Sequence, residues 1–380
     1  MKKKGLAIIA LLLTLTTLPS CSMLEGFMTN GFGTAIENQE EKETISVTAP
    51  IGEVYPYIPA VQRYLETGES ANVSNFGGAQ NQYRGVKIEW VCTADNVARY
   101  DVEYATKEDY SDVLRETVAE NSVELFNLYK GTVYYLRVSA YDEDGKVITH
   151  ADSTFKTTDL GPRVMKIDGI YNVRDLGGYK AADGKTTMQG LIYRGGSLTP
   201  ADIYPHNLTD SGKAYMRDVL GIKTEIDFRS ATEAGGHTES PIPGANLKYV
   251  TLGGYSDAFT NYADAYKDAF LMFANKNNYP IYMHCTGGAD RTGTVSFLLN
   301  ALLGVSELEC IQDYELTTFS IYGARNTKQG AYAQYCQDFF NTLQLYKGRT
   351  LQQKVESYLL SIGLSEEDIS SIKAIMYGEK

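Results

Sequence analysis

The sequence has few of the residues that form cross-links and metal sites. Its 380 residues include five cysteines and four histidines, with no Cys-x-x-Cys pair and no spacing typical of metal ligands. So few cysteines exclude a disulfide scaffold, although they leave room for one disulfide. Cys92 lies in a strand-like run and Cys310 in a helix-like run, so both are expected to pack in a core.

Positive charge is also scarce. Lysine and arginine number 35 against 47 aspartates and glutamates, which gives a net charge of −12. This balance argues against nucleic acid as a partner and against an anionic membrane surface as the main binding target. The sequence also has no Gly-x-Ser-x-Gly, His-Glu-x-x-His or P-loop lysine motif, so the enzyme classes that these motifs mark find no support.

The one long apolar run lies at the N-terminus. A positive start, Met1–Lys4, precedes the apolar stretch Gly5–Leu18, which is too short to span a bilayer and is typical of a secretory signal peptide over residues 1–20. Its end, Leu-Pro-Ser-Cys21, resembles the lipobox of bacterial lipoproteins, in which the cysteine is lipidated. A plain signal peptide with a coincidental Cys21 is the alternative. We expect an exported, membrane-anchored lipoprotein, facing the cell surface or periplasm, with a flexible tether at 21–43.

Alternating apolar and polar residues predict an all-β domain over residues 44–159. The expected strands are 86–90, 100–104, 133–141 and 153–157. Short strands separated by turn signals favour a β-sandwich. Trp90 in an early strand, with Leu128 six residues before Tyr134, resembles a fibronectin type III module and its tyrosine corner. The segment 50–84 is longer than the usual first connection and has no assignment. The domain shows no catalytic cluster, so we interpret it as a spacer or docking module.

The C-terminal domain, 163–380, has a different pattern. Strands are predicted at 192–194, 224–228 and 281–283, and helices at 211–220, 257–275, 292–303, from Ser306, and near 329–344, 349–362 and 366–376. Few strands early and many helices late predict an α/β domain, with a central sheet flanked by helices. In such a domain a phosphate site lies at the carboxyl end of a strand.

The stretch from His284 to Gly293, HCTGGADRTG, carries the chemistry. A strand, a loop of small residues and a helix direct backbone amides and a helix N-terminus at one point, which makes an anion site. The same positive field favours the thiolate of Cys285, and the planar fork of Arg291 suits two phosphate oxygens. A nucleophile, an anion cradle and a charge clamp within seven residues predict phosphomonoester hydrolysis through a cysteinyl-phosphate. Cys-x5-Arg alone would be weak, but the flanking residues and the strand-to-helix context coincide with it.

This loop resembles that of cysteine-dependent tyrosine phosphatases. More narrowly, it resembles a bacterial branch with Asp before the Arg and an upstream N-x-R-D-x-G-G-Y segment, whose members act on phosphotyrosine, phosphoserine or phosphoinositides. The matching residues are Asn172, Arg174, Asp175, Gly177, Gly178 and Tyr179, with Tyr193–Gly195 and Asp227–Ser230 as intermediate blocks. The likeness covers 163–380 and implies an α/β phosphatase domain. Many members have Lys where this chain has Ala289, which weakens the case for highly anionic lipid headgroups.

We assign roles from these two arguments. Cys285 is the expected nucleophile, and Arg291 binds phosphoryl oxygens and stabilises the transition state. His284 is expected to shape the loop, and Thr292 either donates to the Cys285 sulfur or is a plain helix residue. Arg174 and Asp175 either form a local ion pair or line the pocket mouth. The predicted substrate-binding residues are therefore Thr286, Gly287, Gly288, Ala289, Thr292, His284, Arg174 and Asp175.

The leaving group needs a proton, and Asp290 is the favoured donor. Repulsion from a bound phosphate dianion favours the protonated carboxyl group of a residue inside the anion loop. The resembled branch also implies this residue as the acid. Asp257, Asp264 and Asp227 compete for the role, and Asp290 would then make a structural bond within the loop.

Three functions remain open at this point. The favoured one is a phosphatase of phosphotyrosine or other phosphoprotein residues, and small phosphate esters are further candidate substrates of an exported enzyme. The second is a phosphoinositide or inositol phosphate phosphatase. The third is an exported binding protein with an inactive phosphate loop, which the intact set of Cys285, Asp290 and Arg291 opposes. The mechanism requires no cofactor and no metal.

Overall fold

The structure is a computed structural model that describes residues 44–68, 82–200, 204 and 207–379. The predicted signal peptide, Cys21 and the whole predicted tether lie outside the described residues. Among the described residues, no helix combines the length and the apolar character needed to cross a membrane. The elements below all belong to one unit, Glu43–Lys380. The four described cysteines, at 92, 285, 310 and 336, are free thiols.

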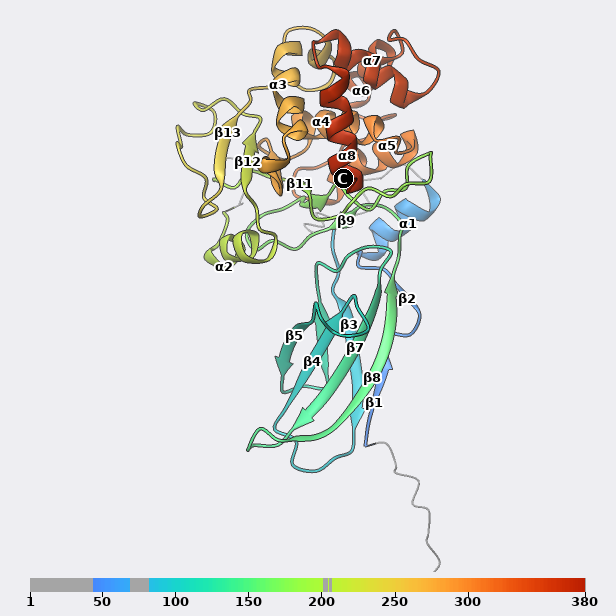
Figure 1. The fold of residues 1–380 in the computed structure, drawn as a ribbon, viewed down its shortest axis with the longest axis vertical. Coiled ribbons are helices and arrows are strands. Elements are labelled where there is room, and N and C mark those ends of the chain that lie inside the picture. The colour runs from blue at the N-terminus through green and yellow to red at the C-terminus, as the bar shows by residue number, and fades with distance from the viewer. Residues whose placement is uncertain (1–43, 69–81, 201–203, 205–206, 380) are drawn as a thin grey trace, which may run out of the picture. The chain divides into compact units, whose positions relative to one another are not determined.

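The N-terminal part is a β-sandwich of two sheets, as the sequence predicts (Figure 1). The three-stranded sheet has the order β1 (Ile45–Ala49), β3 (Val86–Cys92) and β6 (Ser122–Leu125). The five-stranded sheet has the order β2 (Glu53–Val54), β8 (Val147–Thr157), β7 (Val133–Tyr141), β4 (Arg99–Ala105) and β5 (Leu114–Val118).

The inward-facing residues of these strands form the sandwich core. Trp90 and Tyr134 are both buried in it, together with Leu128. The hydroxyl of Tyr134 accepts a hydrogen bond from the amide of Tyr129 at 2.8 Å. This bond ties the side chain of a strand residue to the preceding turn, so the predicted tyrosine corner is present.

The unassigned segment 50–84 contains a helix that the sequence analysis missed, α1 (Pro59–Thr67). Proline at its first turn and Gly68 at its end, with φ 63°, are ordinary start and stop signals. Its apolar face does not join the sandwich core. Val61 and Leu65 pack with Leu316 of the C-terminal domain in a separate cluster. The predicted sandwich, 44–159, therefore carries an insert that packs elsewhere.

The C-terminal sheet has six strands in the order β13-β12-β14-β11-β10-β9. Their bounds are β9 (Arg163–Val164), β10 (Arg174–Asp175), β11 (Ile192–Gly195), β12 (Thr224–Asp227), β13 (Asn246–Tyr249) and β14 (Ile281–His284). Strands β11 to β14 are parallel, and β10 and β9 extend the sheet antiparallel. The register places Gly195 and Asp227 on either side of His284, so three carboxyl ends meet at one edge.

Helices cover both faces of this sheet. Figure 1 shows α3, α4 and α8 on one side of β12 and β13 and α2 on the other. The helices are α2 (Asp210–Ala214), α3 (Ala263–Ala274), α4 (Asp290–Leu302), α5 (Glu307–Glu315), α6 (Ala333–Leu343), α7 (Leu351–Ser361) and α8 (Glu366–Tyr377). Short helical turns are Tyr215–Val219, a π turn, and Tyr255–Phe259, Lys276–Asn278 and Leu316–Phe319, which are 3-10 turns. The predicted α/β class is confirmed, but the predicted helix 257–275 is divided into a 3-10 turn and α3.

Helix α4 is the centre of the larger core. Every residue from Thr292 to Leu302 is buried, because α5 and α7 cover the sides that the sheet leaves open. A helix buried on all sides cannot shift without disturbing close-packed neighbours. The N-terminus of α4 is therefore held firmly at the end of β14, where the candidate loop begins.

Candidate active site

In the loop between β14 and α4, every carbonyl group from Cys285 to Ala289 has a hydrogen-bonding partner within the protein. His284 Nδ1 lies 3.0 Å from the carbonyl oxygen of Cys285. The carbonyl of Thr286 accepts from the amide of Ser197 at 3.0 Å. The carbonyl of Gly287 accepts from Asn172 Nδ2 at 2.9 Å, and that of Gly288 accepts from Arg194 Nη2 at 2.5 Å. The carbonyl of Ala289 accepts from the amide of Gly293 at 2.8 Å, within α4.

These bonds decide where the amides point. In a trans peptide the N–H points opposite to the C=O of the same peptide plane. Carbonyls fixed against the protein therefore turn the amides of Thr286 to Asp290 to the other side of the loop. Together with Arg291, these amides donate no hydrogen bond to any described residue. They converge with the N-terminus of α4, which is the anion site that the sequence predicts.

Two loop glycines allow this packing. Gly288 has φ +62°, and a Cβ there would lie 2.0 Å from the carbonyl oxygen of Gly195. At Gly287 a Cβ would lie 2.9 Å from the ring of Tyr322. Larger residues would push the loop off β11 and lose the hydrogen bonds to its carbonyls.

Cys285 and Arg291 occupy the two ends of this loop. Cys285 is only 4% exposed. Arg291 makes an end-on pair with Glu233, with Nη1 to Oε2 at 2.8 Å and Nη2 to Oε1 at 2.6 Å. These bonds lower the pKa of Glu233. The Nε–H of Arg291 and the second hydrogen of Nη2 remain for a side-on pair with a phosphate, so Glu233 orients the fork that the sequence predicts to bind phosphate.

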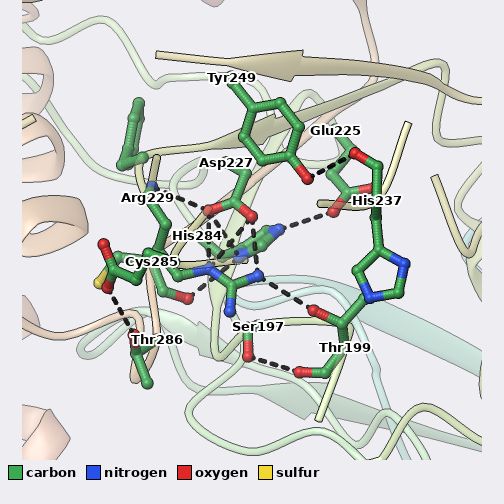
Figure 2. A network of polar contacts seen from close by, with 12 residues as sticks. Ser197, Thr199, Glu225, Asp227, Arg229, His237, Tyr249, His284, Cys285 and Thr286 are labelled. Carbon is green, nitrogen blue, oxygen red and sulfur yellow. Dashed lines mark hydrogen bonds and ion pairs between the residues drawn. The ribbon is translucent and has the colours of Figure 1, made fainter. Parts of the chain in front are cut away.

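A buried charge network lies behind Cys285. Figure 2 shows Glu225 and Asp227 converging on the ring of His284. His284 Nε2 lies 2.8 Å from Glu225 Oε1, and its Nδ1 must donate, because the carbonyl of Cys285 can only accept. Burial lowers the pKa of His284, but Asp227 and Glu225 outweigh it and raise the pKa above its ordinary value. The imidazolium is thus favoured. His284 is fully buried, so its predicted substrate contact is wrong and its predicted loop-shaping role is supported.

The prediction that Arg174 and Asp175 contact substrate is also wrong, because both are fully buried. They do not pair with each other. Arg174 pairs with Asp313 at 2.9 Å, and Asp175 pairs with Arg163 at 3.2 Å. Asp313 also binds Arg194, the residue that holds the loop at Gly288. Burial raises the pKa of Asp313, but the two guanidinium groups outweigh this and lower it.

Asp290 is at the first turn of α4 and its carboxylate is already paired. Arg325 donates to it through Nε at 2.7 Å and Nη2 at 3.0 Å, and the hydroxyl of Tyr255 donates as well. Tyr255 adopts φ 56°, in the left-handed region, a conformation that is unusual for a bulky residue and concentrates at functional sites. Its amide bonds Thr294 Oγ1 at 2.8 Å, which holds it there.

A pocket of about 310 Å³ opens beside Asp290 and Arg291. Its wall includes Tyr255 and Tyr335, whose rings stack with centroids 5.5 Å apart, and its rim includes Asp257 and Asp338. Of the other candidate acids, Asp264 is exposed on α3 and does not line the pocket. Asp227 is buried in a pair with Arg229 at 2.8 Å. Asp257 is thus the one competitor of Asp290 that lines this pocket.

Two family models match parts of the chain. The model of the tyrosine phosphatase family matches residues 165–378, more than half of the chain. The chain belongs to the tyrosine phosphatase family. The fibronectin type III model matches residues 71–156, which confirms the nature of the sandwich.

Individual tyrosine phosphatase relatives cover only part of the chain. A candidate tyrosine-protein phosphatase of Cupriavidus necator is 28% identical over 40% of this chain, and the match spans 63% of that protein's length. A tyrosine-protein phosphatase of Nostoc commune is 23% identical over 46% of this chain and 74% of its own. Among solved structures, the catalytic core of the PP-IP phosphatase SIW14 of S. cerevisiae is similar at 21% identity, covering 39% of this chain and 80% of that chain, with a TM-score of 0.27.

The remaining loop residues that were predicted to bind substrate differ in exposure and in their hydrogen bonds. Thr286 is partly exposed, and its hydroxyl lies 3.4 Å from Glu233 Oε1. Gly287, Gly288 and Ala289 are buried and contribute backbone only. Thr292 is buried, and its Oγ1 has no hydrogen-bond partner, so the predicted bond to the Cys285 sulfur is not formed.

Sequence reasoning missed several residues of the phosphatase site. Arg194 stood in a quoted motif without a role, and Asp227 was considered only as a competing acid. Glu233 follows shortly after the Asp227–Ser230 block, but this position in the sequence does not by itself indicate a contact with Arg291. Asp313 and Arg325 had no local signal, because their partners are distant in the sequence.

Among the described residues, one group of side chains lies close enough together to bind a metal ion, but its hydrogen bonds do not suit that role. Glu225, Asp227 and His284 offer ligand atoms within 4.8 Å of one another. However, both carboxylate oxygens of Asp227 accept hydrogen bonds from Arg229, and His284 Nε2 faces Glu225. The guanidinium already neutralises this site, so we interpret the group as a buried charge network.

The first prediction concerns Glu233. Glu233→Gln keeps the shape but removes the charge that orients Arg291, so tungstate, a phosphate mimic, should bind about three- to tenfold more weakly. Calorimetry measures this affinity. Glu239→Gln, the same change at an exposed position on the same loop, is the control. Equal affinities for the wild type and Glu233→Gln would show that the pair does not position Arg291.

Proposed function

We propose that this tyrosine phosphatase family member is an active phosphomonoesterase that works through a cysteinyl-phosphate. One observation carries the proposal. The loop from Cys285 turns a row of unpaired amides to one side, with a cysteine at its start and the oriented fork of Arg291 at its end. This arrangement fits a phosphoryl group with charge spread over three equatorial oxygens.

The chemistry follows from these positions. The Cys285 thiolate attacks phosphorus, the bond from phosphorus to the ester oxygen breaks, and that oxygen takes a proton from an acid. Water then attacks the phosphorus of the cysteinyl-phosphate and gives its proton to the same group. The S–P bond breaks, which regenerates the thiolate and releases inorganic phosphate. The amides and Arg291 hold the oxygens throughout.

We propose Asp290 as this acid and base. Its carboxylate lies in the first turn of α4 beside Arg291 and lines the pocket. Arg325 holds this carboxylate in place through two hydrogen bonds. A phosphate dianion adds a negative charge close by, which favours protonation of Asp290 and competes with the pair to Arg325. Tyr255 keeps the carboxyl group in place through its hydroxyl.

The pocket favours phosphotyrosine as the substrate. Its tyrosine wall suits an aromatic leaving group, because aromatic rings pack well against each other in offset or edge arrangements. Asp257 and Asp338 on its rim have no cationic partner among the described residues. Uncompensated carboxylates repel polyanions, so inositol polyphosphates and phosphoinositides are the weaker alternative. Ala289 supplies no extra cation.

The decisive test of the proposed function is hydrolysis of a phosphotyrosyl peptide by the wild type and by Cys285→Ser, with chelator present. The wild type should turn over without metal, and Cys285→Ser should lose at least about a thousandfold in kcat while it still binds tungstate. Inositol hexakisphosphate serves as the polyanionic comparison. No turnover by a folded wild type would favour the binding-protein hypothesis.

The acid makes a separate prediction. Asp290→Asn should slow alkyl and phenyl phosphates with poor leaving groups by about a hundredfold, and nitrophenyl phosphate, which needs little protonation, far less. Steady-state kcat across a series of leaving groups measures this dependence. Asp257→Asn is the matched comparison. If the steep dependence appears in Asp257→Asn and not in Asp290→Asn, the roles are exchanged.

We also propose that the protein is exported and anchored by a lipid on Cys21. Support comes from the positive start, the short apolar run and the cysteine that follows Leu-Pro-Ser. The natural substrates would then be phosphoproteins or small phosphate esters outside the cytoplasm. Cys21→Ala should move the protein from the membrane fraction to the soluble fraction of its host. Retention in the membrane would contradict the anchor.

A further inference from the structure

We propose that the insert in the sandwich is a working part of the phosphatase site, and that Gln82 is the positioning residue through which it fixes the phosphate loop. The described parts of the insert are residues 55–68 and 82–83. Helix α1 lies outside both family matches, 71–156 and 165–378, whereas Gln82 falls within the first of them.

Gln82 is polar but only 3% exposed. Its Nε2 donates to Asn172 Oδ1 at 2.7 Å and to the carbonyl of Leu316 at 2.8 Å. Its Oε1 lies 3.4 Å from Nη1 of Arg174. A glutamine with its amide fully engaged inside another domain is a built contact, because any one of these groups left unpaired would destabilise the fold.

Asn172 connects Gln82 to the loop, because it bonds both. Its Nδ2 donates to the carbonyl of Gly287 at 2.9 Å. An asparagine amide can turn over and exchange its oxygen for its nitrogen, so its orientation depends on its neighbours. Gln82 and Arg174 both donate to Oδ1, which leaves only Nδ2 to face Gly287. Gln82 thereby helps to hold the carbonyl of Gly287, and with it the forward-facing amide of Gly288.

The insert is held in this place by contacts other than Gln82. The hydroxyl of Tyr64 donates to Glu315 Oε2 at 2.7 Å, and Gln312 Nε2 donates to the carbonyl of Leu65 at 3.3 Å. The hydroxyl of Tyr57 donates to the carbonyls of Leu160 and Pro162 at 2.7 and 2.8 Å. These buried bonds join the apolar cluster of α1, so a change at Gln82 should leave the insert docked.

The experiment compares Gln82→Leu with Gln62→Leu in the full chain. Gln62 lies on α1, and among the described residues its side chain bonds only Glu66, so the second variant makes the same chemical change away from the loop. We expect Gln82→Leu to weaken tungstate binding and kcat/KM for nitrophenyl phosphate by about tenfold, with faster hydrogen exchange in Cys285–Arg291. Gln62→Leu should match the wild type in all three measurements.

A double-mutant cycle with Asn172→Ala separates positioning from general destabilisation. If Gln82 acts through Asn172, adding Gln82→Leu to Asn172→Ala should cause little further loss. Full additivity, or a Gln82→Leu protein with wild-type tungstate affinity and exchange, would overturn the proposal. Gln82→Glu, whose charge faces Arg174, replaces Gln82→Leu if the latter fails to fold. If the wild type hydrolyses nothing, the proposed function fails, while tungstate affinity and exchange still decide this inference.

Discussion

The site depends on one constraint, that the carbonyl groups of the phosphate loop must be bound from behind. A loop of small residues has no side chains to fix its own conformation, and free carbonyls facing the pocket would repel a phosphate. The protein meets this constraint with a different donor for each carbonyl from Cys285 to Gly288: a histidine, a backbone amide, an asparagine and an arginine. The amides that face the anion are therefore oriented by groups that do not contact it.

Holding those donors requires buried charge. Arg194 and Arg174 share the carboxylate of Asp313, and His284 lies between Glu225 and Asp227. Burying an ion is unfavourable unless partners neutralise it and complete its hydrogen bonds. Each cation here has at least one carboxylate in contact, and the carboxylates accept from several donors. The same ion pairs also fix the direction of each donor. The contacts that neutralise the buried charges therefore also set the geometry of the loop.

The insert changes how the two family domains relate within the chain. The sandwich has its own core, around Trp90 and Tyr134, and the phosphatase domain has another around α4. Helix α1 and Gln82 come from the sandwich part of the sequence but join the second domain. The domain boundary drawn near Gly161 and Pro162 thus separates two sheets, but it does not separate the residues that support the catalytic loop.

The sequence by itself determined the chemistry of the loop, the α/β class and the sandwich, because these depend on spacings within a few residues and on strand and helix periods. It did not determine the partners. Arg174 meets Asp313 across 139 positions, Gln82 meets Asn172 across 90, and Arg291 meets Glu233 across 58. No local pattern specifies such pairs, so Arg174 and Asp175 fit a pocket mouth as well as a core. Only tertiary packing, which buries some charges and exposes others, decided between those readings.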